Sequence, residues 1–370
     1  MNKDTKLGVI LNTSTVIALK MDNYKIITPN IAIIGSGGGL RAVIGMSAAM
    51  TALKERGILD STMYTAGLSG SAWYLMSLYS CKRPNATELN TKLRETVPQI
   101  RSNMFLYAWY TWKYYTSWLH QFKNKNITVA DPFGYLISSF LLQKNVPWSE
   151  QENKLKNGAM PLPLIAALHV REEKSIEDYH GMCGNEKIIE ENIIQADSRT
   201  DLIDFKEDFM MLVDAGLAFN SPYPTVLHPS RKVDVILSFD FSYRGSDSEW
   251  PFRQLEKAEE WARKRCIPFP KLKLDTIKEK CKGGNYEEVY VFKEDNSPII
   301  VHFVMINKSF RKLGDGKHDF DIHSNYHTMR LNYSEEEYNK LNSLVQHNVL
   351  ENEKKIVDCI LEAIHRKQNN

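Results

Sequence analysis

The feature that most constrains the fold is a run of glycines between a buried strand and a helix. Residues 31–34 are apolar and β-branched, which is typical of a strand buried on both faces. Residues 35–39 are mostly glycine, and glycine lets the backbone approach another group closely and present its N–H donors. From Leu40 to Leu53 apolar residues recur at helical spacing, and Gly57 stands where a C-terminal helix glycine is expected. The sequence predicts a strand, a glycine loop and a helix.

A second strand–turn–helix unit follows directly. Residues 63–66 can form a strand and residues 72–79 a helix, with Gly67-Leu-Ser-Gly-Ser71 between them. Small residues on both sides of Ser69 suit a sharp turn that exposes a nucleophilic hydroxyl, although Ser71 replaces the last glycine of G-x-S-x-G. The competing interpretation is an ordinary helix start with Ser69 or Ser71 as N-cap. Taken alone, the turn favours that second interpretation.

Together, the two units favour ester hydrolysis. A serine hydrolase needs a nucleophile and N–H donors that hold the oxyanion of the tetrahedral intermediate. The glycine loop can supply those donors, and the helix that follows adds a partial positive charge. Arg41 places a permanent cation beside the loop, suited to a substrate phosphate or carboxylate. A surface ion pair explains Arg41 equally well.

The same glycine loop also fits a dinucleotide site. Gly37-x-Gly39-x-x-Ala42 satisfies the relaxed G-x-G-x-x-A pattern between a strand and a helix. That pattern needs an acidic residue at the end of the next strand, and Asp60 lies before that strand. We therefore rank a dinucleotide site below a hydrolase.

The composition indicates a soluble globular protein and argues against several other classes. With 43% hydrophobic and 25% charged residues and a net charge of +2, the chain offers no case for nucleic-acid binding. No apolar run approaches a membrane span, and no secretory signal is recognisable. The five cysteines are scattered and form no C-x-x-C pair, which argues against disulfides and structural zinc: Cys81, Cys183, Cys266, Cys281 and Cys359. We expect a cytoplasmic protein with no metal and no cofactor.

Further elements place an acidic residue near the expected site. Asp214 follows a buried strand, and ligands collect beyond that edge of an open α/β sheet. A turn or N-cap aspartate is the competing interpretation. The predicted strands are 162–170, 209–213, 233–239 and 299–306. Helices are predicted over 86–97, ending at Pro98, and over 249–265. Two C-terminal helices start at a Ser334–Glu337 capping box and end near His365.

Ser69 also needs a base that takes its proton. A Ser–Asp dyad requires the carboxylate to contact the hydroxyl directly in a dry site, where burial raises its basicity. A triad needs a histidine, and four histidines follow Asp214 in the chain, so a Ser…Asp…His order stays open: His228, His302, His323 and His327.

An aromatic stretch between Phe105 and Trp118 is followed by Lys123 and Lys125. Trp and Tyr beside Lys favour a membrane interface. A helix this aromatic on every side is also typical of a buried element, and we rank burial slightly higher.

Five segments together resemble the catalytic domain of the cytosolic (group IV) phospholipase A2 family, whose α/β fold is shared with patatin. They are Gly35-Ser-Gly-Gly-Gly-Leu-Arg-Ala42, Gly67-Leu-Ser-Gly-Ser-Ala-Trp-Tyr74, Asp214-Ala-Gly-Leu-Ala-Phe-Asn220, Pro222-Tyr-Pro224 and Leu237-Ser-Phe-Asp-Phe-Ser242. Ile267-Pro-Phe-Pro270 looks most like the calcium-independent gamma branch. The resemblance implies a three-layer fold with a mostly parallel central sheet between helices. We expect one catalytic domain over residues 30–370, and we assign residues 1–29 no role.

The resemblance also implies the chemistry. Ser69 falls on the family's nucleophile, Asp214 on the base that activates it, and Arg41 on the arginine that holds the substrate phosphate. Gly38 and Gly39 are our choice for the oxyanion donors. The implied reaction is hydrolysis of a glycerophospholipid or lysophospholipid ester through an acyl-serine, at the surface of an intracellular membrane.

Three departures from the family pattern matter. We expect no calcium-binding C2 domain before the catalytic part and no C-terminal prenylation anchor. The interval from about residue 171 to 208 is far shorter than in the family and lacks the usual core strand. The chain is therefore either an active phospholipase or a shortened, weakly active or inactive relative that binds lipid or a protein partner. We expect the strand near Ile165, or residues 1–29, to compensate for the missing strand.

Overall fold

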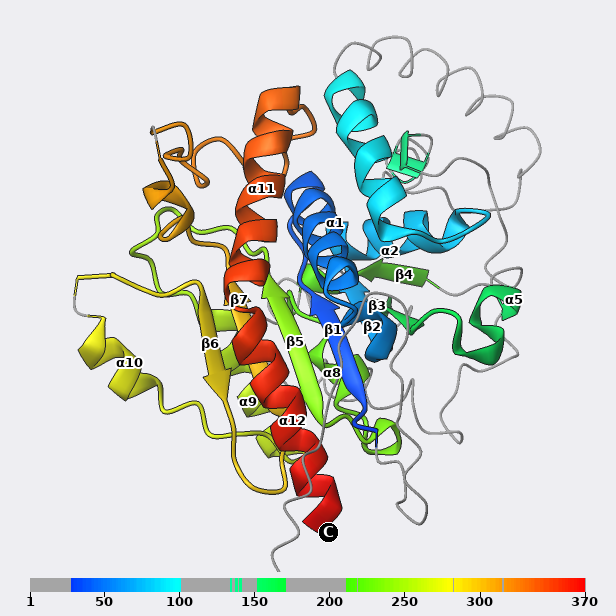
Figure 1. The fold of residues 1–370 in the computed structure, drawn as a ribbon, viewed down its shortest axis with the longest axis vertical. Helices are drawn as coiled ribbons and strands as arrows, with labels where there is room; N and C mark the ends of the chain where they lie inside the picture. The colour runs from blue at the N-terminus through cyan, green and yellow to red at the C-terminus, as the bar shows by residue number, and fades with distance from the viewer. Residues whose placement is uncertain are drawn as a thin grey trace, which may run out of the picture.

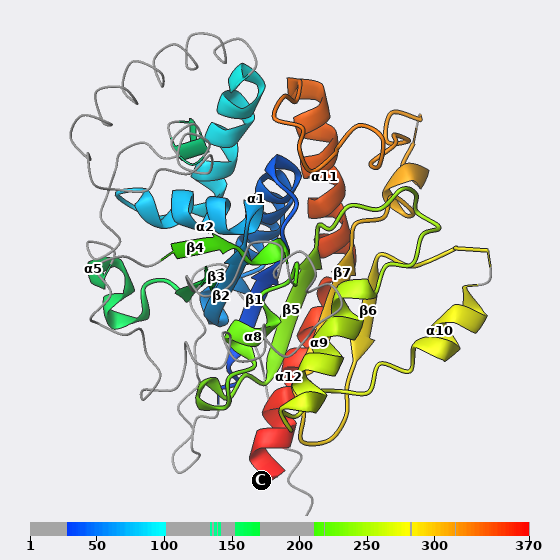
Figure 2. The same cartoon turned by 180° about the vertical axis from the view of Figure 1, so that it is seen from behind.

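The computed structural model describes residues 28–100, 134, 137–138, 140–141, 152–170 and 211–369, apart from residues 218, 282 and 315. The aromatic stretch, Lys123, Lys125 and the shortened interval lie outside the described residues. In the described part, helices cover both faces of one sheet, as the two opposite views show (Figures 1 and 2). The three-layer α/β fold expected from the sequence is confirmed.

The middle layer is a seven-stranded sheet in the order β4–β3–β2–β1–β5–β7–β6. Its strands are β1 (Ile31–Gly35), β2 (Thr62–Leu68), β3 (Leu162–Val170), β4 (Met211–Asp214), β5 (Val235–Asp240), β6 (Val289–Phe292) and β7 (Ile299–Val304). The strands from β3 to β7 in this order run parallel, and the edge strands β4 and β6 are antiparallel to their neighbours. Parallel strands end at the same edge of a sheet. From β1 the chain adds β2 and β3 on one side and β5 and β7 on the other, and open α/β sheets bind ligands at the point where this strand order reverses.

The helices divide between the two faces of the sheet. One face is covered by α1 (Leu40–Glu55), α2 (Gly70–Ser80), α11 (Glu335–Glu351) and α12 (Glu353–Asn369), and the other by α8 (Tyr223–Val226) and α9 (Arg253–Lys264). Ile31 and Ile33 of β1 pack with the first group, while Ala32 and Ile34 pack with the second. Alternate residues of a strand point to opposite faces, which explains why an unbroken apolar run forms this strand.

Two short helices lie at the periphery, α5 (Glu152–Leu155) and α10 (Leu274–Lys280). A further helix covers residues 86–100 and includes Pro98, so the prediction that it ends at Pro98 is wrong. Its buried apolar residues, among them Leu89, Leu93 and Val97, belong to the same core cluster as α1 and α11. This packing outweighs the backbone hydrogen bond that proline removes. No helix in the described part of the chain has the length and apolar character needed to cross a bilayer.

The strand before the shortened interval pairs with the strand after it. β3 lies antiparallel to β4, with Ala167 opposite Asp214 and Val170 opposite Met211. The expectation that the strand near Ile165 would pair with a new neighbour in place of a missing strand stays a prediction, because the shortened interval lies outside the described residues. β4 has only four residues, and Leu162 and Ile165 at the other end of β3 remain 43% and 37% exposed. Within the described residues, β4 therefore pairs only with the last four residues of β3.

Candidate active site

Ser69 stands on a strained turn between β2 and α2. Its φ of +49° lies in the left-handed region, which costs a non-glycine residue about 1–3 kcal/mol. Ser69 is the N-cap residue of α2, but its side chain makes no capping hydrogen bond. The hydroxyl of Ser71 donates to the carbonyl of Ser36 at 2.7 Å instead. Ser69 is therefore an N-cap by position, as the competing interpretation expected, but its hydroxyl caps nothing, and the turn matches one that exposes a nucleophile.

The glycine loop lies against this turn. A Cβ added to Gly37 would lie 3.1 Å from Cβ of Ser69, and one added to Gly70 would lie 2.0 Å from the carbonyl oxygen of Gly39. The N-termini of α1 and α2 therefore meet at Ser69. The backbone N–H groups of Gly38 and Gly39 have no acceptor among the described residues. Free donors beside a serine hydroxyl and two helix N-termini suit a developing negative charge.

Asp214 lies at the same edge of the sheet but is not hydrogen-bonded to Ser69 in the described structure. Its carboxylate is exposed, and its Oδ1 accepts from the N–H of Gly216 at 2.8 Å. β3 stands between the two residues, because Ala166 pairs with Leu68 and Ala167 pairs with Asp214. Two inter-strand steps separate the backbones by about 10 Å. Asp214 is thus near the nucleophile but outside the dry contact that a dyad needs.

Arg41 is fully buried under the glycine loop. Its Nε donates to the carbonyl of Phe241 at 2.8 Å, its Nη1 to the carbonyl of Tyr326, and its Nη2 to the hydroxyl of Thr328 at 3.3 Å. The guanidinium also lies 5.7 Å from the ring centroid of Tyr243. Burial lowers the pKa of Arg41 to about 10, so it stays charged at neutral pH. The surface ion-pair interpretation of Arg41 is wrong, since the side chain is buried and bound to backbone and hydroxyl oxygens.

The candidate histidines lie away from Ser69. His228 lines a cavity at the opposite edge of the sheet. The other three contact neither Ser69 nor Asp214 in the described structure. Their partners are Ser238 Oγ for His302 Nδ1 (3.1 Å), Asp247 Oδ1 for His323 Nε2 (2.8 Å) and the stacked ring of Tyr243 for His327 (4.9 Å between centroids). None of these four histidines therefore completes a triad in the described structure.

A polar network supports the glycine loop from the side of β5. The hydroxyl of Ser36 donates to Asp240 Oδ1 at 3.1 Å and accepts from the N–H of Phe241 at 2.7 Å. Asp240 Oδ1 also accepts from the N–H of Ser242 at 2.9 Å, and the amide of Asn220 donates to Ser242 Oγ at 2.8 Å. We missed these supports in the sequence. The only available indication was that polar residues follow the end of a buried strand.

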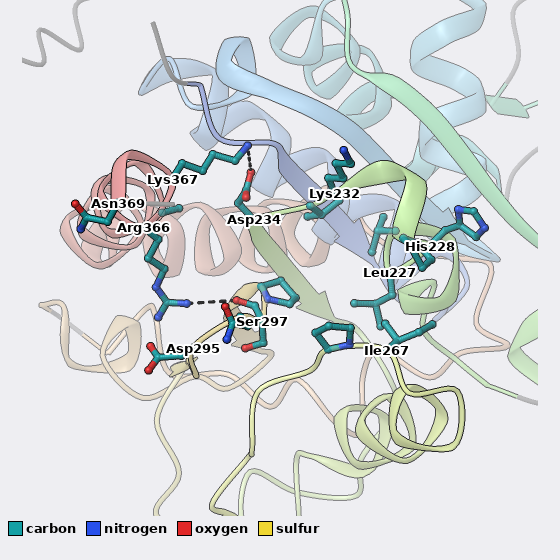
Figure 3. A pocket seen from close by; sticks show the side chains of 17 residues that line it. Leu227, His228, Lys232, Asp234, Ile267, Asp295, Ser297, Arg366, Lys367 and Asn369 are labelled. Carbon is teal, nitrogen blue, oxygen red and sulfur yellow. Dashed lines mark hydrogen bonds and ion pairs between the residues drawn. The ribbon is translucent and has the colours of Figure 1, made fainter. Parts of the chain in front are cut away.

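A cavity of about 580 Å³ lies at the opposite edge of the sheet, where β5 and β7 begin. Figure 3 shows Leu227 and Ile267 on one side of it, the Lys367–Asp234 ion pair (2.6 Å), and Arg366 bound to the carbonyl of Ser297 (3.3 Å). Apart from the candidate histidine His228, none of the predicted site residues lines this cavity. The described residues also contain no group of His, Cys, Asp or Glu side chains that could hold a metal ion.

Three comparisons with known proteins agree. A family model described as the lysophospholipase catalytic domain matches residues 31–192. Cytosolic phospholipase A2 zeta of the mouse (Mus musculus) is 22% identical, covering 92% of this chain and 58% of that protein. The structure of human GIVD cytosolic phospholipase A2 superposes with a TM-score of 0.73 at 19% identity, covering 93% of this chain and 64% of that one. The structure of that protein in complex with methyl gamma-linolenyl fluorophosphonate superposes with a TM-score of 0.68 at 21% identity, covering 93% of this chain and 60% of that one.

These matches confirm the resemblance to the group IV cytosolic phospholipase A2 family and its catalytic-domain fold. The finer assignment to the gamma branch stays a prediction. This chain spans little more than half the length of the mouse relative. The aligned region, 504 positions, is longer than the whole chain of 370 residues, so that relative has residues within the region that this chain lacks.

Proposed function

We propose that this chain, which carries the catalytic-domain fold of the group IV cytosolic phospholipase A2 family, hydrolyses an acyl ester of a glycerophospholipid or lysophospholipid through Ser69. One observation carries the proposal. The hydroxyl of Ser69, held on a left-handed turn and unused as a helix cap, lies beside a loop whose Gly38 and Gly39 N–H groups have no acceptor among the described residues. A nucleophile next to unused donors suits acyl transfer.

The proposed reaction has two halves. The step requires the carboxylate of Asp214 to move into contact with Ser69. The oxygen of Ser69 then attacks the ester carbonyl carbon while its proton passes to that carboxylate. The tetrahedral intermediate then expels the glycerol oxygen, which takes up that proton, and leaves an acyl-serine. In the second half water attacks the acyl-serine, gives its proton to the same carboxylate, and releases the fatty acid. The proton returns to Ser69 and the enzyme is restored.

The charges around Ser69 favour the intermediate over the neutral ester. In this proposal the N–H groups of Gly38 and Gly39 donate to the oxyanion, and the positive ends of α1 and α2 lie beside them. Nη2 of Arg41 lies 3.2 Å from the position that a Cβ on Gly38 would occupy, so a full positive charge sits below the loop. This charge is buried and therefore little screened by solvent.

We also propose that Arg41 receives the substrate phosphate. The contact to Thr328, at 3.3 Å, is longer than that to Phe241, at 2.8 Å. A phosphate oxygen that displaces the Thr328 hydroxyl would gain a charged partner, and charge-assisted hydrogen bonds are stronger than neutral ones. Tyr326 and Phe241 would continue to hold the guanidinium from the other side.

Covalent labelling tests the nucleophile. Folded protein is treated with a fluorophosphonate probe, and the labelled peptide is identified by mass spectrometry. We expect one adduct, on Ser69, and none in Ser69→Ala. Ser77→Ala is a matched control, because Ser77 lies on the same helix and donates only to the carbonyl of Trp73. An adduct on another serine, or folded wild-type protein that never reacts, would refute the proposal.

Substitutions test the base. Asp214→Asn is expected to remove nearly all ester hydrolysis, since nucleophile and base act as one unit. Variants of His323 and His327, each made alone, should retain substantial activity. A correctly folded histidine variant as inactive as Ser69→Ala would replace the dyad by a triad.

A shortened relative that binds lipid without hydrolysing it is the second candidate function. The observation in its favour is the position of Asp214, which is exposed and separated from Ser69 by β3. Sedimentation with phospholipid vesicles, followed by analysis of released fatty acid, separates the two functions. Binding without release at any pH would favour the second.

A further inference from the structure

Asn220 joins the segment that carries Asp214 to the glycine loop. Its side-chain amide donates to the carbonyl oxygen of Gly37 at 3.2 Å and to Ser242 Oγ at 2.8 Å. Its backbone N–H donates to Gln254 Oε1 at 3.1 Å. Both amide protons and the backbone donor are thus used, which fixes the side chain in one orientation.

The bond to Gly37 determines where the next N–H group points. The carbonyl of Gly37 and the N–H of Gly38 belong to one planar trans peptide, in which the two groups point in opposite directions. An amide that holds the carbonyl therefore directs the N–H of Gly38 away from Asn220. That N–H is one of the two proposed oxyanion donors, and it has no acceptor among the described residues.

The preceding peptide is held in the same way. The carbonyl of Ser36 accepts from the hydroxyl of Ser71 at 2.7 Å, which fixes the N–H of Gly37. The glycine loop is therefore oriented through its carbonyl groups: Ser71 holds the first, and Asn220 holds the next, which also lies 3.2 Å from the Ser36 hydroxyl. Without these bonds a glycine-rich segment would have wide conformational freedom.

The contact between Asn220 and the loop is close-packed. A Cβ added to Gly37 would lie 2.3 Å from Oδ1 of Asn220, and one added to Gly216 would lie 3.0 Å from the same oxygen. The partner Ser242 is itself fixed by Asp240, whose Oδ1 also accepts from Ser36. A change of rotamer at Asn220 is therefore opposed by its neighbours on several sides.

We propose that Asn220 is a positioning residue that orients the N–H of Gly38 toward the oxyanion of the tetrahedral intermediate. The assignment rests on the proposed hydrolysis at Ser69 and adds a residue that touches neither substrate nor nucleophile. Loss of this side chain should impair the chemical step more than substrate binding, because only the charge that develops during reaction uses the donor.

The test compares Asn220→Ala with Asn30→Ala. Asn30 is a matched control, since its side-chain amide also donates two hydrogen bonds, here to the carbonyls of Arg231 (3.1 Å) and Lys232 (3.0 Å), but at the opposite edge of the sheet. Labelling of Ser69 by a fluorophosphonate is followed against probe concentration, which separates the maximal rate from the half-saturating concentration. Glycine-selective isotope labelling and NMR follow the Gly38 amide directly.

In folded Asn220→Ala we expect the maximal labelling rate to fall about tenfold to a hundredfold, with the half-saturating concentration nearly unchanged. Removing an oxyanion donor outright costs about 10²–10³-fold, and a misdirected donor should cost less. The Gly38 resonance should shift or broaden in Asn220→Ala and stay in place in Asn30→Ala. Asn220→Asp keeps the shape but cannot donate when ionised, and should behave like Asn220→Ala.

A wild-type labelling rate, or an unmoved Gly38 resonance, would overturn the positioning role. Equal loss of labelling in the Asn30→Ala control would reduce Asn220 to a general structural contact. If the wild-type protein itself is not labelled, the proposed hydrolysis fails, and the NMR comparison still decides whether Asn220 orients the loop.

Discussion

Replacing Arg41 by lysine keeps the positive charge but removes the planar guanidinium, which connects α1 to two other parts of the chain by hydrogen bonds. The guanidinium binds Phe241 after β5 and Tyr326 and Thr328 in the segment before α11. A single ammonium group cannot reproduce this geometry. At least one buried carbonyl group would lose its donor, at a cost of about 1–3 kcal/mol. We expect Arg41→Lys to lower the free energy of unfolding by that amount.

Arg244→Lys is the matched control. Arg244 is also buried and donates to two backbone carbonyls, of Glu249 at 3.3 Å and Met305 at 2.6 Å. Burial lowers the pKa of both arginines. Arg244 is expected to be structural only, so its lysine variant should lose stability without a change in substrate preference.

The assay combines urea unfolding with hydrolysis of two substrates, a phospholipid and a small neutral ester. If Arg41 holds the substrate phosphate, Arg41→Lys should impair phospholipid hydrolysis far more than neutral-ester hydrolysis, while Arg244→Lys affects both alike. An equal loss on both substrates in folded Arg41→Lys would refute the phosphate contact. If Arg41→Lys unfolded at the same urea concentration as the wild type, the structural role of Arg41 would be refuted.

Four further predictions follow from the described contacts. Gly39→Ala should destabilise the fold by about 2 kcal/mol or more in urea unfolding, because φ is +62° and the new Cβ would lie 2.2 Å from the Thr328 carbonyl oxygen. Gly57→Ala is the control: φ is +70° but the space around it is open, so the free energy of unfolding should fall by only about 1 kcal/mol. His302 has a pKa lowered to about 4 by burial, so only the unfolded chain takes up its proton between about pH 6.5 and 4, and stability should fall by about 2 kcal/mol from pH 7 to pH 5. A His302→Gln variant should lack that part of the pH dependence. Asp214→Asn should unfold like the wild type, since its exposed carboxylate accepts only a local bond from Gly216; a large loss of stability would contradict this. Chelators should leave any hydrolysis unchanged, and inhibition by EDTA would contradict the expectation of a metal-free site.

The parts of the site that follow local rules could be predicted from the sequence. The apolar run before Gly35 and the glycines after it determine a strand and a loop through nearest neighbours alone. The capping box at Ser334 and Glu337 is another local pattern, and both of its hydrogen bonds are present, at 3.1 and 2.8 Å. Such patterns depend on a few consecutive residues, so the rest of the chain does not alter them.

The contacts that give Arg41 and Asn220 their roles could not be predicted. Arg41 binds residues 200 to 287 positions away, and Asn220 binds Gly37 across 183 positions. No local pattern specifies which carbonyl oxygen a distant side chain will meet. The neighbour of β3 is a similar case, because a strand pattern indicates the strand but not its partner. Pro98 shows the converse, a strong local rule outweighed by tertiary packing.

The pairing of β1 with β5 has a consequence for how this chain folds. Ile31 pairs with Val235, so the centre of the sheet closes a loop of about 200 residues, for which the chain-length part of the entropy cost is about 5 kcal/mol. β1 to β3 leave the ribosome first, without the strand that completes their sheet. Phe239, which accepts the N–H of Ser36, and Thr328, which packs on Gly39, follow much later. The glycine loop beside Ser69 is therefore expected to reach its final conformation only after Phe239 and Thr328 have been synthesised. A nascent chain that ends before β5 should expose the apolar edge of β1 to chaperones.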